Sequence, residues 1–339
     1  MRRETERYDV MEWYEDEITQ YISENPCTEW QCGTGGCLDI KTTKKQVIAK
    51  VKSLLKSLVE QRQLCAEKYD NCITGISEAF DVTDMMYTSS SSKSAYLHLD
   101  EFYAQYGDDS DIIHFPRNDF WYRTVKAKDD KFFTEDELYR IPPEKVHKNG
   151  RYNETACSTM YISNRAKLSW YEARKPQKFT LAKFRIKNGT DLVLFQIHSG
   201  RQFENENGMQ TPWRNNPKQV DHLLHYLIMM PLYSLMSIKD RYECTIQFMN
   251  WLIDRKIASG VIYTNCQLQY DGRECDGRKI THQNYNIAIP ATDIQKPENL
   301  FEIEKERPFD LPNDIMEEKN ESEQISKLNQ LFQQEGIFI

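Results

Sequence analysis

Five short segments decide the fold, and in chain order they read Phe120-Trp-Tyr-Arg123, Glu137-Leu-Tyr-Arg-Ile-Pro-Pro143, Asn149-Gly-Arg151-Tyr152-Asn153, Met160-Tyr161-Ile-Ser163 and Trp170-Tyr-Glu172-Ala-Arg174. β-Branched and aromatic residues favour strands over Phe120–Ala127 and Thr159–Ile162. The stretch Lys167–Arg174 is predicted to be a helix. Turn residues separate these elements, so the region alternates strand, turn, strand and helix, as a mixed α and β domain does.

Predicted strands and helices continue to alternate toward the C-terminus. Further strands are predicted over Phe179–Ile186, Asp191–Ile197, Ser259–Thr264 and Tyr285–Ala291, and helices over Gln219–Met236 and Tyr242–Lys256. From residue 292 onward the chain loses strand character, and Glu317–Gln334 is predicted to be a charged helix that docks on the body.

The N-terminal part has helical periodicity instead. Apolar residues recur at helical spacing over residues 8–24 and again over residues 43–72, where lysines cover the opposite side. We therefore predict an α+β protein with a helical N-terminal region over residues 1–110, a mixed domain over 111–295 and a C-terminal tail over 296–339.

Composition excludes several classes of function. The chain has 339 residues and a net charge of −8, so it has no overall charge with which to attract nucleic acid, and nucleic-acid binding is not expected. The charged N-terminus contains no apolar signal segment, and no stretch reaches the 18 apolar residues of a membrane span. We expect a cytoplasmic protein with no membrane partner.

The five segments, taken in order, resemble the RES domain. That family shows an aromatic-Arg pair on its first strand, then a Gly-Arg-aromatic-Asn element, then a Tyr on the next strand and a helix that bears a Glu. Later pieces are also similar, since Gly260-Val-Ile-Tyr263 matches the strand that leads to the family's Ser and Asn284–Ile289 matches its closing strand. The likeness covers roughly residues 115–295. It implies a compact ADP-ribosyltransferase-like β-core flanked by helices, with NAD as substrate in a central cleft.

The resemblance also implies roles for individual residues. It makes Arg123, Tyr161 and Glu172 catalytic, and it places Tyr122, Arg123, Arg151, Tyr152 and Asn153 around the NAD. These residue types suit the chemistry, because breaking the nicotinamide–ribose bond develops positive charge on the ribose that a carboxylate stabilises. Arginine supplies a two-pronged donor for the pyrophosphate.

One position departs from the family pattern. Where the family has its Ser, this chain reads Tyr263-Thr264-Asn265-Cys266. Simple alignment puts Asn265 at that position and Thr264 one place earlier, and only Thr264 offers a hydroxyl. We include both among the catalytic candidates, while the acceptor of the ADP-ribosyl group stays open between water, phosphate and a macromolecule.

Partners and rival functions follow from the same resemblance. RES proteins commonly act as toxins with a neutralising antitoxin, so an antitoxin or regulatory protein is an expected partner, and self-association stays open. One rival is an RNA-processing protein of the HEPN class, because such helical domains are found fused to RES domains. Arg140 and His147 have the spacing of that class, but Pro142 and Pro143 would break the helix that its motif requires. The other rival is a binding module without catalysis.

The cysteines form a second signal. Cys27, Cys32 and Cys37, together with Cys65 or Cys72, have thiolates that could bind zinc, although the spacing is wider than the usual rule. The alternative interpretation is a set of free thiols in a loop and on a helix.

Overall fold

The computed structural model describes residues 40–60, 64–88, 92–115, 120–127, 133, 135–197, 219–236, 242–264, 271–275, 278–282, 285–293 and 295–337. The predicted helix over residues 8–24 and three cysteines, Cys27, Cys32 and Cys37, lie outside these ranges. The chain divides into two compact units, one of residues 1–111 and 198–251, and one of residues 112–197 and 252–339.

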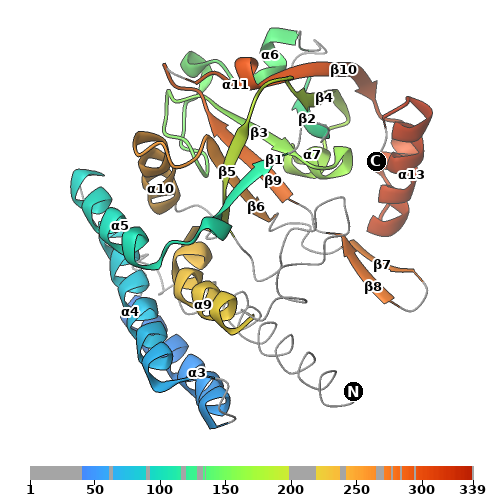
Figure 1. Cartoon of the computed structure of the whole chain (residues 1–339). Coiled ribbons are helices and arrows are strands. Elements are labelled where there is room, and N and C mark those ends of the chain that lie inside the picture. The colour runs from blue at the N-terminus through green and yellow to red at the C-terminus, as the bar shows by residue number, and fades with distance from the viewer. Residues whose placement is uncertain are drawn as a thin grey trace. The chain divides into compact units, whose positions relative to one another are not determined.

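The first unit is helical (Figure 1). Its described elements are α3 (Ile40–Glu60), α4 (Ala66–Thr88), α5 (Ser92–Tyr106), the 3-10 turn η1 (Asp109–Asp111), α9 (Gln219–Met236) and the larger part of α10 (Glu243–Asp254). The prediction of a single helix over residues 43–72 is wrong, because α3 ends at Glu60 and α4 begins at Ala66. Leu64, between the two helices, is buried. Gly75 of α4 lies so close to Tyr106 and Ile228 that a Cβ would clash, which lets α5 and α9 approach α4.

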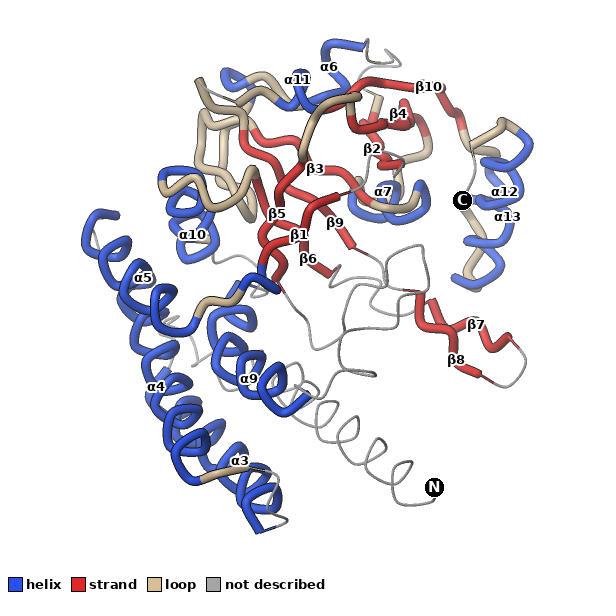
Figure 2. The backbone as a smooth tube through the Cα atoms, viewed as in Figure 1, coloured by secondary structure: helices blue, strands red, loops and turns tan. Residues whose placement is uncertain are grey.

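The second unit is built on a sheet (Figure 2). Its strands are β1 (Ile112–Phe115), β2 (Phe120–Lys126), β3 (Thr159–Ser163), β4 (Lys178–Ile186), β5 (Leu192–Ile197), β6 (Gly260–Thr264), β7 (Asp271–Cys275), β8 (Arg278–His282), β9 (Tyr285–Pro290) and β10 (Phe301–Asp310). Its helical elements are α6 (Glu135–Tyr139), η2 (Pro143–Lys145), α7 (Ala166–Glu172), α11 (Pro297–Leu300), α12 (Asn313–Met316) and α13 (Glu321–Gln334).

Eight of the described strands form one sheet in the order β1-β5-β6-β9-β3-β2-β4-β10, and β7 pairs only with β8. The β5–β6 pair is parallel and the other pairs of this sheet are antiparallel. Both helices and a mixed sheet are present, so the predicted α+β class is confirmed.

One face of this sheet is covered by α7 and α13. Trp170 of α7, Phe179 of β4, Phe309 of β10 and Phe332 of α13 are fully or nearly fully buried and pack in one core cluster. The apolar stripe of α13 therefore docks on the body as the sequence predicts.

The boundaries differ from the sequence-based division. Residues 219–236 and 242–251 belong to the helical unit, although the sequence places them inside the second domain. The predicted loss of strand character after residue 292 is wrong, because β10 pairs with β4 along its length. β10 is an edge strand, and an edge strand tolerates charged residues and proline such as Pro308. Because of this composition, β10 lacks the apolar alternation by which a strand is predicted from sequence. No helix in the described ranges combines the length and the apolar character needed to cross a membrane.

Candidate functional site

The ring of Tyr263 lies near three of the residues that the sequence singles out, namely Arg151, Tyr152 and Glu172. Tyr263 is on β6, and the ring centroid of Tyr152 lies 5.0 Å from its own. The guanidinium carbon of Arg151 is 5.5 Å from the centroid of the Tyr263 ring. Burial and the negative charge of Glu172 raise the pKa of Tyr263 well above its ordinary 10, although Arg151 acts in the opposite direction. Tyr263 is therefore a neutral phenol at physiological pH.

A chain of hydrogen bonds fixes the carboxylate of Glu172. The Ser163 hydroxyl donates to Oδ1 of Asn286 over 2.6 Å, which sets the orientation of the amide. Nδ2 of Asn286 then donates to Oε1 of Glu172 over 2.9 Å. Ser163 and Asn286 are buried, whereas Glu172, the last residue of α7, is exposed. The result is a carboxylate that is held from the protein side and open to solvent.

The Gly-Arg-Tyr-Asn turn folds onto Tyr161. The Tyr161 hydroxyl donates to Oδ1 of Asn153 over 2.8 Å and accepts the backbone N–H of Tyr152 at 3.0 Å. The backbone N–H of Gly150 donates to the carbonyl of Asn153, and a Cβ on Gly150 would lie 2.3 Å from Oδ1 of Asn153. Only glycine fits this turn. The Tyr161 hydroxyl thus holds the turn that positions Arg151 beside Tyr263.

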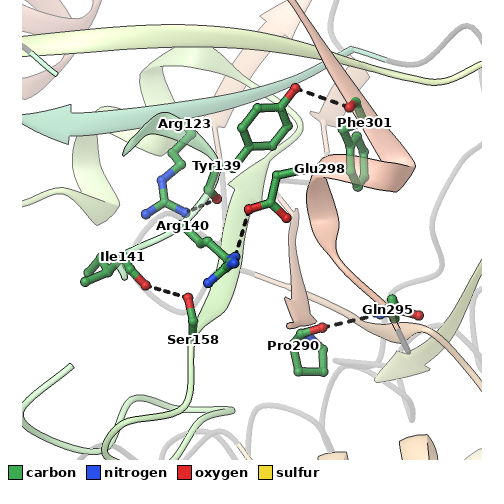
Figure 3. Close-up of polar contacts among 9 residues, drawn as sticks. All are labelled: Arg123, Tyr139, Arg140, Ile141, Ser158, Pro290, Gln295, Glu298 and Phe301. Carbon is green, nitrogen blue, oxygen red and sulfur yellow. Dashed lines mark hydrogen bonds and ion pairs between the residues drawn. The ribbon is translucent and has the colours of Figure 1, made fainter. Parts of the chain in front are cut away.

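Arg123 of β2 lies against the backbone of Tyr139 (Figure 3). Its guanidinium Nη1 donates to the backbone carbonyl of Tyr139 over 2.8 Å. Burial lowers the pKa of Arg123 to about 10, and the Tyr161 hydroxyl acts on it in the opposite direction. β2 and β3 pair only at Tyr122 and Ser163, so the two strands part at the residues that carry Arg123 and Tyr161. Arg123 is thus a buried cation next to the position where β2 and β3 stop pairing.

Tyr122 belongs to the hydrophobic core of the second unit. It packs in the core cluster beneath α7 with Trp170 and Tyr171. Burial, together with the charge of Glu304, raises its pKa to about 12. Side chains alternate along a strand, so Arg123 points to the opposite face of β2. The structure therefore brings Arg151, Tyr152, Asn153, Tyr161 and Glu172 together. Arg123 lies near enough to Tyr161 for the hydroxyl to act on its pKa, whereas Tyr122 belongs to the core.

The remaining candidates have less structural context. Thr264 ends β6 opposite Tyr285, but its side chain and the whole of Asn265 lie outside the described residues. Cys65 is an exposed free thiol, and no metal-binding group of three or more His, Cys, Asp or Glu occurs among the described residues. Arg140 and His147 are not on an α-helix, since α6 ends at Tyr139. Arg140 instead pairs with Glu298, Nε to Oε1, at 2.9 Å (Figure 3).

Sequence reasoning missed three residues of the group, namely Ser163, Tyr263 and Asn286. Asn286 could have been predicted from the sequence, because it is the polar residue of the otherwise apolar strand segment Asn-Ile-Ala-Ile. A buried polar side chain needs a hydrogen-bond partner, so such a residue is a candidate for a site. Tyr263 resembles an ordinary core tyrosine, so its place could come only from the pairing of β6 with β9.

Comparisons with known proteins add little. No protein-family model and no curated protein matches the chain. Among solved structures, the chain is similar to one from the crystal structure of the M. tuberculosis MbcT–MbcA toxin–antitoxin complex, at 12% identity and a TM-score of 0.32. The match covers 56% of this chain and 84% of that chain.

Proposed function

We propose that this protein cleaves NAD at the bond between nicotinamide and ribose. The observation that carries the proposal is the Glu172 carboxylate, held by Asn286 at 2.9 Å and exposed on its outer side. The resemblance of residues 115–295 to the RES domain supports the same assignment, because it places the family's glutamate at Glu172 and its Gly-Arg-aromatic-Asn element at residues 150–153.

The reaction needs a fixed negative charge more than it needs an acid. When the C1′–nitrogen bond breaks, its electron pair leaves with nicotinamide, which departs as a neutral molecule. Positive charge then grows on the ribose ring, as in glycoside hydrolysis. In our proposal Glu172 stabilises that charge and hydrogen-bonds a ribose hydroxyl. The acceptor, which is water, phosphate or a macromolecular group, adds a lone pair to C1′ and loses a proton.

Two arginines suit the charged part of NAD. Arg151 lies over the ring of Tyr263, and the charges of Arg151 and Glu172 both act on the pKa of that phenol. In our proposal the Arg151 cation meets a pyrophosphate oxygen. Arg123 is buried, and the Tyr139 carbonyl accepts from only one of its guanidinium nitrogens. A buried cation favours an anionic ligand, because no water is available to solvate it. In our proposal Arg123 contributes this contact where β2 and β3 part.

The first prediction tests Glu172. Glu172→Gln keeps the shape and the acceptor for Asn286 but removes the negative charge, so turnover should fall far more than NAD binding weakens. A loss of about a hundredfold corresponds to roughly 2.7 kcal/mol of transition-state stabilisation. NAD loss in an enzymatic assay and NAD binding by calorimetry, on the same preparation, measure the two effects.

The matched control is Glu144→Gln, which changes an exposed glutamate of η2 that makes no described contact with Glu172 or Asn286. It should leave turnover unchanged. Undiminished turnover in Glu172→Gln would contradict the mechanism. Induced expression separates the rivals, since total cellular NAD should drop with the wild type and not with Glu172→Gln. Loss of RNA with constant NAD would favour the HEPN-type function, and no change in either would favour a binding module.

A further inference from the structure

A hollow of about 440 Å³ lies at the C-terminal end of α7, lined by Lys126, Ala127, Arg174, Lys175, Pro176, Gln177 and Lys178. Four of these seven residues are cations and none is acidic. This concentration is not a background property of the chain, whose net charge is −8. The volume falls within the range of small-molecule sites.

The backbone of this hollow has an unusual conformation. The N–H groups of Arg174 and Lys175 donate to the carbonyls of Tyr171 and Trp170 at 2.9 and 3.0 Å, which is the pattern of a Schellman helix end. Arg174 and Lys175 have φ angles of 65° and 50°, in the left-handed region where glycine is the usual residue. Two cationic residues therefore stand where glycine would be less strained.

The rim of the hollow is held in place from the core. The indole N–H of Trp170, a fully buried side chain, donates to the carbonyl of Pro176 over 2.9 Å. The backbone N–H of Ala127 donates to the carbonyl of Lys178 over 2.9 Å, which ties β2 to the start of β4. The four cations thus project from a framework that is fixed before any ligand binds, and such preorganisation favours binding.

Two of the four cations of the hollow, Lys178 and Lys175, have partners on the protein. Nζ of Lys178 lies 3.6 Å from a carboxylate oxygen of Asp310, and Nζ of Lys175 lies 4.1 Å from the centroid of the Tyr171 ring. Arg174 and Lys126 are exposed, and within the described part of the chain neither forms an ion pair. An arginine fork and three ammonium groups around one hollow suit a compact ligand with several negative charges.

We propose that this hollow binds a small molecule with two or more phosphate groups. The ligand is recognised by its phosphate oxygens, because the lining offers cations and no unoccupied aromatic ring for a base. The lining of the hollow does not include Glu172 or Asn286, and the proposal does not depend on NAD cleavage. The same protein therefore has two anion-binding features, one beside Tyr263 and one at the end of α7.

Calorimetry on the full chain, with inorganic tripolyphosphate as probe, tests this site. The informative variant is Arg174→Gly, because glycine keeps the left-handed backbone while the cation is lost. We expect the wild type to bind tripolyphosphate, Arg174→Gly and Lys126→Gln each to weaken binding about tenfold or more, and the melting temperature of Arg174→Gly not to fall. The control Lys148→Gln, an exposed lysine outside the hollow, should bind like the wild type.

Three results would overturn the proposal. These are no binding by the wild type at low salt, an equal loss of affinity in Lys148→Gln, and unchanged affinity in Arg174→Gly. Equal binding of a short poly-glutamate peptide would overturn the assignment to phosphate. Each result is independent of whether the protein cleaves NAD, because the measurement is binding of a probe that contains no nicotinamide.

Discussion

At the scale of single residues, His225 couples the helical unit to pH. Its Nε2 lies 2.8 Å from Oδ1 of Asp111, a carboxylate with no exposed surface. Burial lowers the pKa of His225, but the hydrogen bond and charge of Asp111, with the charge of Asp108, outweigh it, so the net pKa is raised above 6.5. A raised pKa in the folded state means that folding favours the protonated imidazole.

We therefore predict that the helical unit loses stability as pH rises. The stabilisation from His225 is fully present below about pH 6.5, the unfolded value, and is lost as pH passes the higher folded value. His225→Gln should flatten this dependence and lower stability most at acidic pH. Hydrogen exchange of the α9 amides at several pH values measures it. Equal protection at pH 6 and pH 8.5 in the wild type would contradict the prediction.

Arg123 is the second residue-scale test. Arg123→Ala should lower NAD cleavage at least about tenfold, because one charge-assisted hydrogen bond to the pyrophosphate is lost. It should also lower the free energy of unfolding by about 1–3 kcal/mol, because the buried Tyr139 carbonyl loses its donor. Both quantities are measured on one preparation. A folded Arg123→Ala protein with wild-type turnover would remove Arg123 from the NAD site and leave it a structural role.

At the scale of elements, α7 and α13 determine the stability of the second unit. Phe332 of α13 is fully buried, and its ring centroid lies 5.3 Å from that of Phe309 and 6.5 Å from that of Phe179. α13 in turn packs against α7, which ends in Glu172. The C-terminal residues are thus part of the framework behind the candidate site, although the sequence presents them as a tail.

Phe332→Ala should lower the free energy of unfolding by about 3–5 kcal/mol, because it leaves a cavity beside the rings of Phe309 and Phe179. Chemical denaturation of the full chain, followed through the second unit, measures the change. Gln333→Ala is the matched control, since Gln333 is exposed on the same helix and its loss should change little. A similar small effect for both variants would mean that α13 is a detachable tail.

At the scale of the whole molecule, we predict that the N-terminal cysteines bind zinc. If Cys27, Cys32 and Cys37 bind zinc with a fourth thiolate, Cys65 is the better candidate, because it is exposed. The buried Cys72 thiol has its pKa raised to about 12 by desolvation and donates toward the Leu224 carbonyl. The purified protein should then contain about one zinc ion per chain, and a chelator should loosen the N-terminal region.

Elemental analysis of the wild type, Cys32→Ser and Cys157→Ser tests this prediction. Cys157 is an exposed thiol in the second unit, so its variant should retain the metal. A metal-free wild type with unchanged stability would leave the four cysteines as free thiols.

Local sequence determined much of this protein. Alternating aromatic and β-branched residues predicted β2, β3, β4 and β9 because strand pattern is a property of neighbouring residues. The Gly-Arg-Tyr-Asn turn could be read in the same way, since Gly150 is required by contacts within four residues. The order of the motifs made Glu172 and Arg151 candidates, and their roles stay predictions.

Tertiary structure alone decided the rest. The division of the chain follows from which helices bury their apolar faces together, and residues 219–251 join a unit whose other helices precede residue 112. Ser163, Tyr263 and Asn286 meet because β6, β9 and β3 are adjacent, although about a hundred residues separate Ser163 from Tyr263. A motif fixes which residues occur, whereas strand alternation and the parting of β2 from β3 fix the face on which each one acts.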